Sequence, residues 1–425
     1  MNINLRGGNT RNLSIDDRGR LRLARADGVY RAHGEFLSDV YAIDSDSHWR
    51  LKWITQWTAP QVYRKSPSNP IYGPSQSGDW DSWTNGVAIV PFDGGTRYRM
   101  YYSGAEGEGI GFAEAQIDDP LKWTEHPASP VLLPRADNWE GNKINQPRVV
   151  KVTEDHWRMY YSGWGFPGQG THWAMGLAES FDGGVTWERG SEDPVLERGG
   201  QDSADGAGVF VPTLIQAQGQ WWMWYTAARA NPKGYQNIHL CLATSVDGEV
   251  WKKHPENPVL TDDFSDGAPR SVTSRCCVRY DDGVFRMWYS FAKPDYRIHY
   301  AESLDGISWE RSPISPVLGP SPKPAWDDTM VEYPEVQIVD GIFRLWFCGN
   351  GFGSVGYAEG YPQSGVLLSI RTGDSPVPDN SWSDWQRVNR AQVFASRRHV
   401  QVRAELSTEH AAISPALNEV HLVDS

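Results

Sequence analysis

Several features are scarce in this chain of 425 residues, and each scarcity argues against a class of protein. No apolar run approaches the roughly 18 residues that a membrane-crossing helix needs, so no membrane partner is expected. Acidic residues outnumber basic ones, and the net charge of -13 argues against nucleic acid, because phosphate binding needs a basic face. The opening Met1–Asn9 lacks the apolar stretch of a secretory signal, which predicts a cytoplasmic protein unless a leader preceded it.

Cysteine is also scarce. The four residues are Cys241, Cys276, Cys277 and Cys348, without any C-x-x-C spacing. Neighbouring residues on a strand point to opposite faces, so we expect no disulfide between Cys276 and Cys277 and predict buried, reduced thiols. No histidine and cysteine cluster has the spacing of a zinc site, and we expect no cofactor.

Aromatic residues, by contrast, recur in a phrase that the chain repeats five times. Its central residues lie 59, 64, 64 and 58 positions apart, and they are Met100, Met159, Met223, Met287 and Leu345. Each copy is rich in aromatic residues, as in Arg99–Ser103, and Asp-Gly pairs typical of tight turns follow in several units. A period near 60 with about four strands per unit predicts a five-bladed β-propeller with one central pocket.

The domain boundaries follow from this repeat. We assign residues 61–361 to the propeller and expect its last strand to come from Gln61–Arg64. Residues 1–60 and 362–425 alternate as strands, although neither segment has enough strands to bury a core alone. We therefore predict an all-β chain in which the propeller is inserted into a discontinuous β-sandwich.

A family resemblance follows from three motifs. The Asn-Pro-Val-Leu openings, the Met-Tyr-Tyr-Ser-Gly strands and the Ser-x-Asp-Gly-x-x-Trp turns resemble the five-bladed glycoside hydrolases over about residues 62–361. That superfamily includes the arabinofuranosidase and xylosidase class, the invertase class and the mannoside phosphorylases. The resemblance implies an Asp base on the first inner strand and a Glu acid on a later one, since glycosidic cleavage commonly uses two carboxyl groups.

These expected carboxylates are missing from the inner-strand positions at which the resemblance would place them. We align the five inner strands on Gly86, Pro147, Pro212, Arg275 and Pro334. The preceding positions then include Asn85 and Gln146, and Phe210 stands where the resemblance would place a Glu. Site candidates are therefore sought where one copy breaks the repeat.

Glu332 and Glu335 break the repeat in the fifth unit, within Glu-Tyr-Pro-Glu. We predict Glu332 as the proton donor, with Glu335 or Asp81 as the base; the alternative is that these glutamates form ion pairs with arginines. Acidic residues like Asp81 recur in the approach loops of other units, which favours a structural role as loop caps.

Cations and aromatic residues complete the predicted site. Arg148, Arg275 and Arg270, with the loop residue Arg297, suggest an anionic ligand, or else they neutralise the glutamates. The remaining predicted contacts are Asn85, Gln146, His239 on a third strand, and loop aromatic residues that could stack on sugars, namely Trp83, Trp164, Trp173, Tyr235 and Tyr296.

The function predicted from the sequence is a glycoside hydrolase-like enzyme acting on a short oligosaccharide or glycoside, with an acidic sugar as one alternative. A phosphorylase remains open because it needs only one carboxyl group. A non-catalytic sugar-binding propeller, and a lyase or cyclase on the same ring, also remain open. A calcium ion on the central axis is compatible with the sequence.

Overall fold

The computed structural model of the chain describes residues 1–44, 47–74, 80–165, 172–230, 236–262, 272–351, 353–395 and 397–424. In these ranges the regular structure is β-strand, apart from two short 3₁₀ helices, η1 (Asp93–Gly95) and η2 (Ala105–Gly107). The predicted all-β class is confirmed, and no helix in the described ranges is long and apolar enough to cross a membrane. The chain divides into a smaller unit of Met1–Gln61, Asp281–Val284 and Tyr361–Ser425 and a larger unit of Val62–Tyr280 and Phe285–Gly360.

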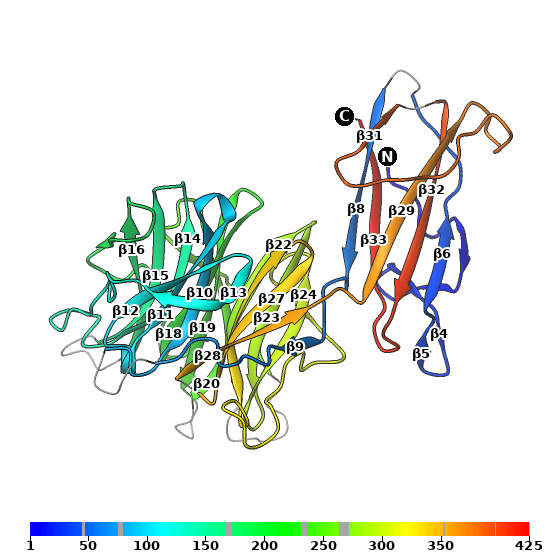
Figure 1. The fold of residues 1–425 in the computed structure, drawn as a ribbon. Coiled ribbons are helices and arrows are strands. Elements are labelled where there is room, and N and C mark those ends of the chain that lie inside the picture. The colour runs from blue at the N-terminus through cyan, green and yellow to red at the C-terminus, as the bar shows by residue number, and fades with distance from the viewer. Residues whose placement is uncertain are drawn as a thin grey trace. The chain divides into compact units, whose positions relative to one another are not determined.

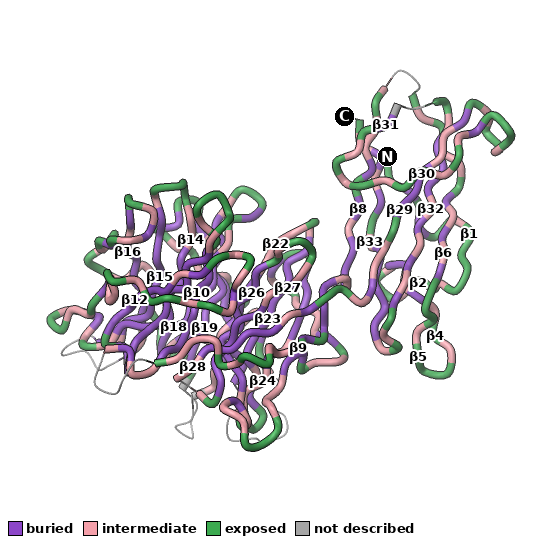
Figure 2. The backbone as a smooth tube through the Cα atoms, viewed as in Figure 1, coloured by how far each residue is buried: buried purple, intermediate pink, exposed green. Residues whose placement is uncertain are grey.

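The smaller unit contains two sheets built from both ends of the chain. Its strands are β1 (Asn9–Arg11), β2 (Leu13–Ile15), β3 (Leu21–Leu23), β6 (His33–Leu37), β7 (Tyr41–Ala42), β8 (His48–Gln56), β29 (Ser364–Gly373), β30 (Gln386–Arg387), β31 (Val393–Ala395), β32 (His399–Thr408) and β33 (Ala416–Asp424), with a separate pair of β4 (Arg25–Ala26) and β5 (Val29–Tyr30). One sheet has the order β1-β6-β32-β29-β30 with β7 beside β32, and the other has the order β2-β3-β33-β8-β31. Leu21, Phe36, Leu51, Val402 and Leu417 pack into one core shared by both sheets. Figure 2 colours the buried parts of the strands purple.

The larger unit consists of five antiparallel meanders of four strands each (Figure 1). The first strands are β10 (Asn85–Phe92), β14 (Ile144–Lys151), β18 (Gly208–Ala217), β22 (Val272–Asp281) and β26 (Val331–Val339). The second strands are β11 (Arg97–Ser103), β15 (Trp157–Gly165), β19 (Gln220–Ala230), β23 (Val284–Ala292) and β27 (Ile342–Gly349). The third strands are β12 (Ile110–Gln116), β16 (His172–Ser180), β20 (Gln236–Ser245), β24 (Tyr296–Ser303) and β28 (Ser354–Gly360). The fourth strands are β13 (Asp119–Glu125), β17 (Glu188–Arg189), β21 (Lys252–Lys253), β25 (Glu310–Arg311) and β9 (Tyr63–Lys65).

The last meander takes its fourth strand from the beginning of the larger unit. β9 pairs antiparallel with β28, which joins Tyr63 to Gly360 and Lys65 to Ala358. The expectation that the segment near residues 61–64 supplies this strand is confirmed. The third and fourth meanders are also joined, by one parallel bridge between Ile238 and Val272.

The repeated phrase forms the second strand of every meander. Its central residues, Met100, Met159, Met223, Met287 and Leu345, have no exposed surface. Apolar and aromatic side chains on this strand pack on both sides, which explains why the phrase carries almost no polar residue at its centre.

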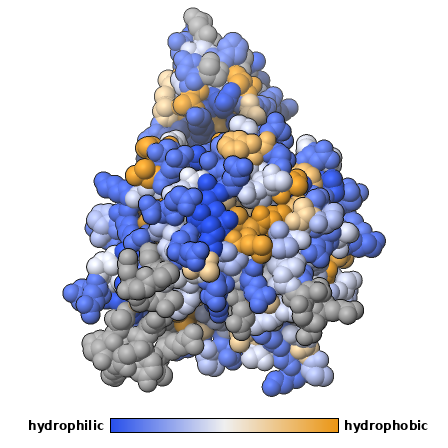
Figure 3. All heavy atoms as spheres, turned by 90° about the vertical axis from the view of Figure 1, so that its left-hand side faces the viewer, coloured by the Kyte–Doolittle hydropathy of each residue, from blue (hydrophilic) through white to orange (hydrophobic). Residues whose placement is uncertain are grey.

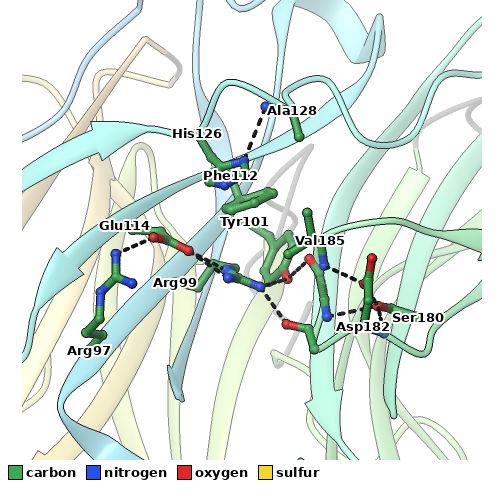
Figure 4. A network of polar contacts seen from close by, with 12 residues as sticks. Arg97, Arg99, Tyr101, Phe112, Glu114, His126, Ala128, Ser180, Asp182 and Val185 are labelled. Atoms are coloured by element: carbon green, nitrogen blue, oxygen red, sulfur yellow. Dashed lines mark hydrogen bonds and ion pairs between the residues drawn. The ribbon is translucent and has the colours of Figure 1, made fainter. Parts of the chain in front are cut away.

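The Asp-Gly turns fasten one meander to the next (Figure 4). Arg99 forms an ion pair with Glu114 at 2.6 Å and donates a 2.6 Å hydrogen bond to the carbonyl of Gly183 in the next meander, while Tyr101 donates to Gly184. Within that turn Asp182 accepts hydrogen bonds from the backbone N–H groups of Val185 and Thr186. Equivalent contacts join Tyr160 to Gly248 and Trp224 to Gly306, so the predicted structural role of these turns is confirmed.

A second set of bonds between meanders involves the last residue of the phrase. Ser103, Ser162, Thr226 and Ser290 accept the backbone N–H of Gln146, Val211, Arg275 and Tyr333, at 2.6, 3.0, 3.0 and 3.1 Å. Cys348 occupies this position in the fifth meander, and its thiol contacts the backbone N–H of Gly86. All five N–H groups belong to residues with positive φ, between 51° and 63°. We call these five contacts the inner clamps.

The inner clamps yield a stability prediction. Ser162→Ala removes the acceptor of the Val211 N–H and should lower the free energy of unfolding by about 1–3 kcal/mol, the cost of an unsatisfied buried donor. Cys348→Ser replaces the thiol by the hydroxyl that the other copies carry, and we expect a change below about 1 kcal/mol. Urea denaturation of the full chain measures both. An Ser162→Ala protein as stable as the wild type would refute the role of the clamps.

The visible surface of the larger unit is mainly hydrophilic. On the face shown in Figure 3 hydrophobic residues form small groups between hydrophilic ones. Some of the most exposed apolar residues, such as Phe181 and Val246, lie in the Asp-Gly turns. The four cysteines are free and buried, as predicted.

Candidate functional site

The first strands of all five meanders line one hollow in the larger unit. Its volume is about 320 Å³ when the open solvent at its mouth is counted. Each strand contributes two or three residues, among them Gly86, Gln146, Val211, Arg275 and Tyr333. These five are the positive-φ residues of the inner clamps, so the same backbone feature shapes the wall on every side.

This backbone feature corrects the alignment of the inner strands. We aligned Gly86 and Arg275 with the prolines Pro147, Pro212 and Pro334, but the positive φ values and the clamps place them with Gln146, Val211 and Tyr333. A bulge interrupts the register at this point, for example between Asn85 and Ala88. In the corrected frame, the position before the bulged residue holds Asn85, Asn145, Phe210, Ser274 and Glu332.

Glu332 and Arg275 form a buried ion pair across neighbouring meanders. Glu332 Oε2 lies 2.7 Å from Arg275 Nη1, and the exposed fractions of the two side chains are 2% and 15%. The guanidinium of Arg275 stacks between the rings of Tyr296 and Tyr333, at 4.6 and 4.5 Å from their centroids. This stacking holds the arginine plane against the wall of the hollow.

Burial raises the pKa of Glu332 above its usual range, and the charge of Arg275 offsets only part of this effect. The ion pair also lacks hydrogen-bond geometry. Glu332 Oε2, Arg275 Nε and Arg275 Nη1 are buried without a hydrogen-bonding partner among the described residues. A carboxyl group with a raised pKa keeps its proton to a higher pH than an ordinary glutamate, and in its protonated form it can donate that proton to a bound molecule.

Further polar groups without partners accompany this pair. Asn85 Oδ1, Asn145 Oδ1, Gln146 Oε1 and Ser274 Oγ are buried and have no hydrogen-bonding partner in the described part of the chain. Three of them stand at the position equivalent to Glu332, and Gln146 at that of Arg275. Of these residues Gln146 lines the hollow, and Asn85, Asn145 and Ser274 directly precede lining residues. Buried polar atoms are normally satisfied, so these groups are candidates for contacts with water or a polar ligand.

A second ion pair, Arg148 and Glu335, lines the same hollow but is fully bonded. Arg148 Nη1 contacts Glu335 Oε2, Gln337 Nε2 donates to Glu335 Oε1 at 3.3 Å, and Arg279 Nη2 lies 3.7 Å from the same oxygen. Burial by itself would lower the pKa of Arg148, yet the neighbouring Glu335 carboxylate raises it. Of the four arginines predicted to meet a ligand, Arg148 and Arg275 are thus paired with glutamates, which was the alternative interpretation of the sequence.

Asp81, the other predicted base, does not line the hollow. It is buried in the approach to β10 and accepts a hydrogen bond from Tyr102 at 3.3 Å. Glu140 and Asp205 have equivalent contacts with Tyr161 and Tyr225, at 2.8 and 3.1 Å. Asp81 therefore belongs to the repeated structural carboxylates, as its recurrence in the sequence suggested.

Three other predicted contacts also lie away from the hollow. His239 on β20 contacts the carbonyl of Ala204 at 2.7 Å, and burial lowers its pKa. Arg297 donates to the carbonyls of Tyr296 and Thr329. Trp164 packs on Trp173, with ring centroids 4.8 Å apart, and Trp173 packs on Phe210 next to Val211. Arg270 and Tyr235 lie outside the described residues.

No cluster of three or more histidine, cysteine, aspartate or glutamate side chains that could hold an ion occurs among the residues with assigned positions. Tyr333, whose ring lies against Arg275 and whose hydroxyl accepts a 3.3 Å hydrogen bond from Gln146, was not predicted as a site residue. Asn145 was missed because the uncorrected frame hid its equivalence to Asn85.

Comparisons with known proteins agree with this architecture. No family model matches the chain. Two uncharacterized proteins of Mycobacterium tuberculosis, from strains CDC 1551 / Oshkosh and ATCC 25618 / H37Rv, are each 29% identical over 68% of this chain and 95% of their own length.

Solved structures give the clearer result. A glycoside hydrolase is 20% identical with a TM-score of 0.56, covering 70% of this chain and 92% of its own. A thermostable family-43 glycoside hydrolase is 16% identical with a TM-score of 0.52, covering 74% and 96%. A structure from the GH130 family of mannoside phosphorylases, which contains glycoside hydrolases that target β-1,2 mannosidic linkages in Candida mannan, is 15% identical with a TM-score of 0.54, covering 72% and 95%. The chain therefore has the fold of the glycoside hydrolases and mannoside phosphorylases of known structure.

Proposed function

We propose that the protein is a carbohydrate-active enzyme that cleaves a glycosidic bond in the hollow of the larger unit, with Glu332 as the proton donor. The observation that carries this proposal is the buried Glu332 carboxyl group, which has a raised pKa, directly precedes the lining residue Tyr333 and pairs with Arg275 of the wall without hydrogen-bond geometry. The unpartnered amide and hydroxyl groups around it suit the hydroxyl groups of a sugar. The shared fold supports the proposal but does not by itself establish the chemistry.

We further infer that the five meanders are the blades of a five-bladed β-propeller. Their first strands line one hollow, and β10 contacts both β14 and β26. The two sheets of the smaller unit, which share one core, would form a β-sandwich interrupted by this propeller. In this interpretation residues 1–60 and 362–425 build the sandwich and residues 61–361 the ring.

Two reactions fit the hollow, and they differ in the group that attacks the sugar. Hydrolysis in its common form needs a second carboxylate to activate water. Glu335 is held by Arg148, and Asp81 contacts Tyr102 outside the hollow. Phosphorolysis needs no second carboxylate because phosphate itself attacks. The lack of another carboxylate free of an ion pair at the described wall favours phosphorolysis as the second candidate.

The experiment is a screen of oligosaccharides and aryl glycosides, including β-mannosides and uronides, with and without inorganic phosphate. Release of free sugar in both buffers identifies a hydrolase, whereas a sugar phosphate formed only with phosphate identifies a phosphorylase. Saturable binding of glycans without any cleavage would instead favour a sugar-binding protein and reject the enzymatic proposal.

A further inference from the structure

Arg148, Glu335 and Arg275 line the hollow, and Glu332, the partner of Arg275, directly precedes the lining residue Tyr333. Only one of these two buried arginine–glutamate pairs is fully hydrogen-bonded. Glu335 receives contacts from Arg148, Gln337 and Arg279, and no buried side-chain nitrogen or oxygen of Arg148 or Glu335 lacks a partner. In the other pair, Arg275 Nη1 and Glu332 Oε2 lie 2.7 Å apart without hydrogen-bond geometry, and Arg275 Nε has no hydrogen-bonding partner among the described residues. The difference separates a structural pair from one that can accept another partner.

The surroundings of Arg275 prepare it for an anion. Its plane is held between Tyr296 and Tyr333, so little side-chain entropy remains to be lost when a ligand binds. Burial acts to lower the pKa of Arg275, but the neighbouring Glu332 raises it well above its usual value, so the guanidinium stays charged. A planar guanidinium whose N–H groups are not all hydrogen-bonded is well suited to bind an oxyanion.

The net charge of the site determines whether a proton must bind together with an anion. Arg275 and Glu332 together are neutral, and an added oxyanion would leave one uncompensated negative charge in a buried site, which is costly. The cost disappears when Glu332 binds a proton from solvent. Glu332 faces Arg275 from β22, Tyr333 on its own strand and Cys348 from β27. Arg275 in turn lies over the ring of Tyr296 from β24.

Of these groups, Glu332 is the one that titrates most easily. Burial raises the pKa of Cys348 to about 12 and also raises that of Tyr333, so both stay neutral near pH 7. A proton taken up at this site therefore goes to Glu332, the group that must be protonated to act as an acid.

We propose that Arg275 binds an oxyanion, which replaces Glu332 as the partner of the guanidinium. Anion binding is then coupled to the uptake of one proton by Glu332. This inference rests on the proposed function, in which Glu332 is the proton donor. Anion binding protonates Glu332 as the reactants arrive. The oxyanion is either the carboxylate of an acidic sugar or inorganic phosphate, and these are the two sources that the experiment separates.

The experiment is calorimetric titration of the full chain with glucuronate, galacturonate, inorganic phosphate and, as the neutral probe, glucose. Each titration is repeated between pH 5.5 and 8 in buffers of different ionisation enthalpy, which counts the protons exchanged. We expect one of the anions to bind with uptake of about one proton and with an affinity that falls up to about tenfold per pH unit. Uptake with uronate alone identifies an acidic sugar, and uptake with phosphate alone identifies phosphate.

Two variants test the residues. Glu332→Gln should bind the same anion without proton uptake and without the pH dependence, and Arg275→Gln should lose anion binding while its circular dichroism spectrum stays that of the wild type. The inference is overturned when no anion binds at millimolar concentration, when binding takes up no proton, or when Glu332→Gln takes up as many protons as the wild type. Because no turnover is measured, failure to cleave any glycoside would reject the proposed function without affecting this result.

Discussion

Glu332→Gln should lower kcat by about 10²–10⁴ on a glycoside with an unactivated leaving group, the range that general acid catalysis contributes. The amide keeps the size of the carboxyl group but cannot donate the proton that the departing oxygen needs. Because KM reflects contacts made by the rest of the hollow, we expect KM to change much less than kcat. Steady-state kinetics on the best substrate from the screen measures both.

Two further measurements distinguish proton donation from a structural effect. An aryl glycoside whose phenol leaves without protonation should lose far less activity in Glu332→Gln than an alkyl glycoside does. The wild-type rate should fall as the pH rises through the raised pKa of Glu332, because the protonated form is the active one, and the variant should lose this limb. An equal loss on both substrates would assign Glu332 a structural role.

The strand pattern was predictable from the sequence because each copy of the phrase lies in the same buried environment. Met100 and its four counterparts are fully buried in the second strand of every meander, and the Asp-Gly turns recur where neighbouring sheets are fastened. Equal environments select equal residues, so repetition reveals them. The repeated strands of the larger unit could be predicted for this reason.

The frame of the inner strands was misjudged because proline was treated as the repeated feature. The conserved element is the positive-φ residue that donates to an inner clamp, and its side chain differs in each meander: Gly86, Gln146, Val211, Arg275 and Tyr333. A backbone conformation leaves little signal when glycine is used only once. The five clamp acceptors, Ser103, Ser162, Thr226, Ser290 and Cys348, are the sequence signal that could have given the frame.

The sequence indicated which charged residues belong to the site but not which of them form ion pairs. Arg148, Arg275, Glu332 and Glu335 stood out because each breaks the repeat. Their partners depend on which strands lie close in space, and Arg148 and Glu335 are 187 positions apart in the chain. The contrast between the complete pair and the incomplete one needs hydrogen-bond geometry, which the residue pattern alone does not contain.

The complete pair gives the largest expected effect on stability. Arg148→Gln leaves the Glu335 carboxylate, whose side chain is 2% exposed, without its main counter-charge. Removing one partner of a buried ion pair typically costs about 3–5 kcal/mol, since the remaining charge is desolvated and unpaired. We expect a loss of this size in the free energy of unfolding of the larger unit, measured as a lower urea midpoint of the full chain.

The matched double variant separates charge from packing. Arg148→Met with Glu335→Leu removes both charges and keeps most of the side-chain volume, so we expect it to recover most of the stability lost by Arg148→Gln. Gln337 keeps its 2.6 Å hydrogen bond to the carbonyl of Ile89 in all these proteins, so that neighbouring bond between meanders is not removed. Should the double variant be no more stable than Arg148→Gln, the loss would reflect a specific hydrogen-bonded geometry at this wall rather than an unpaired charge.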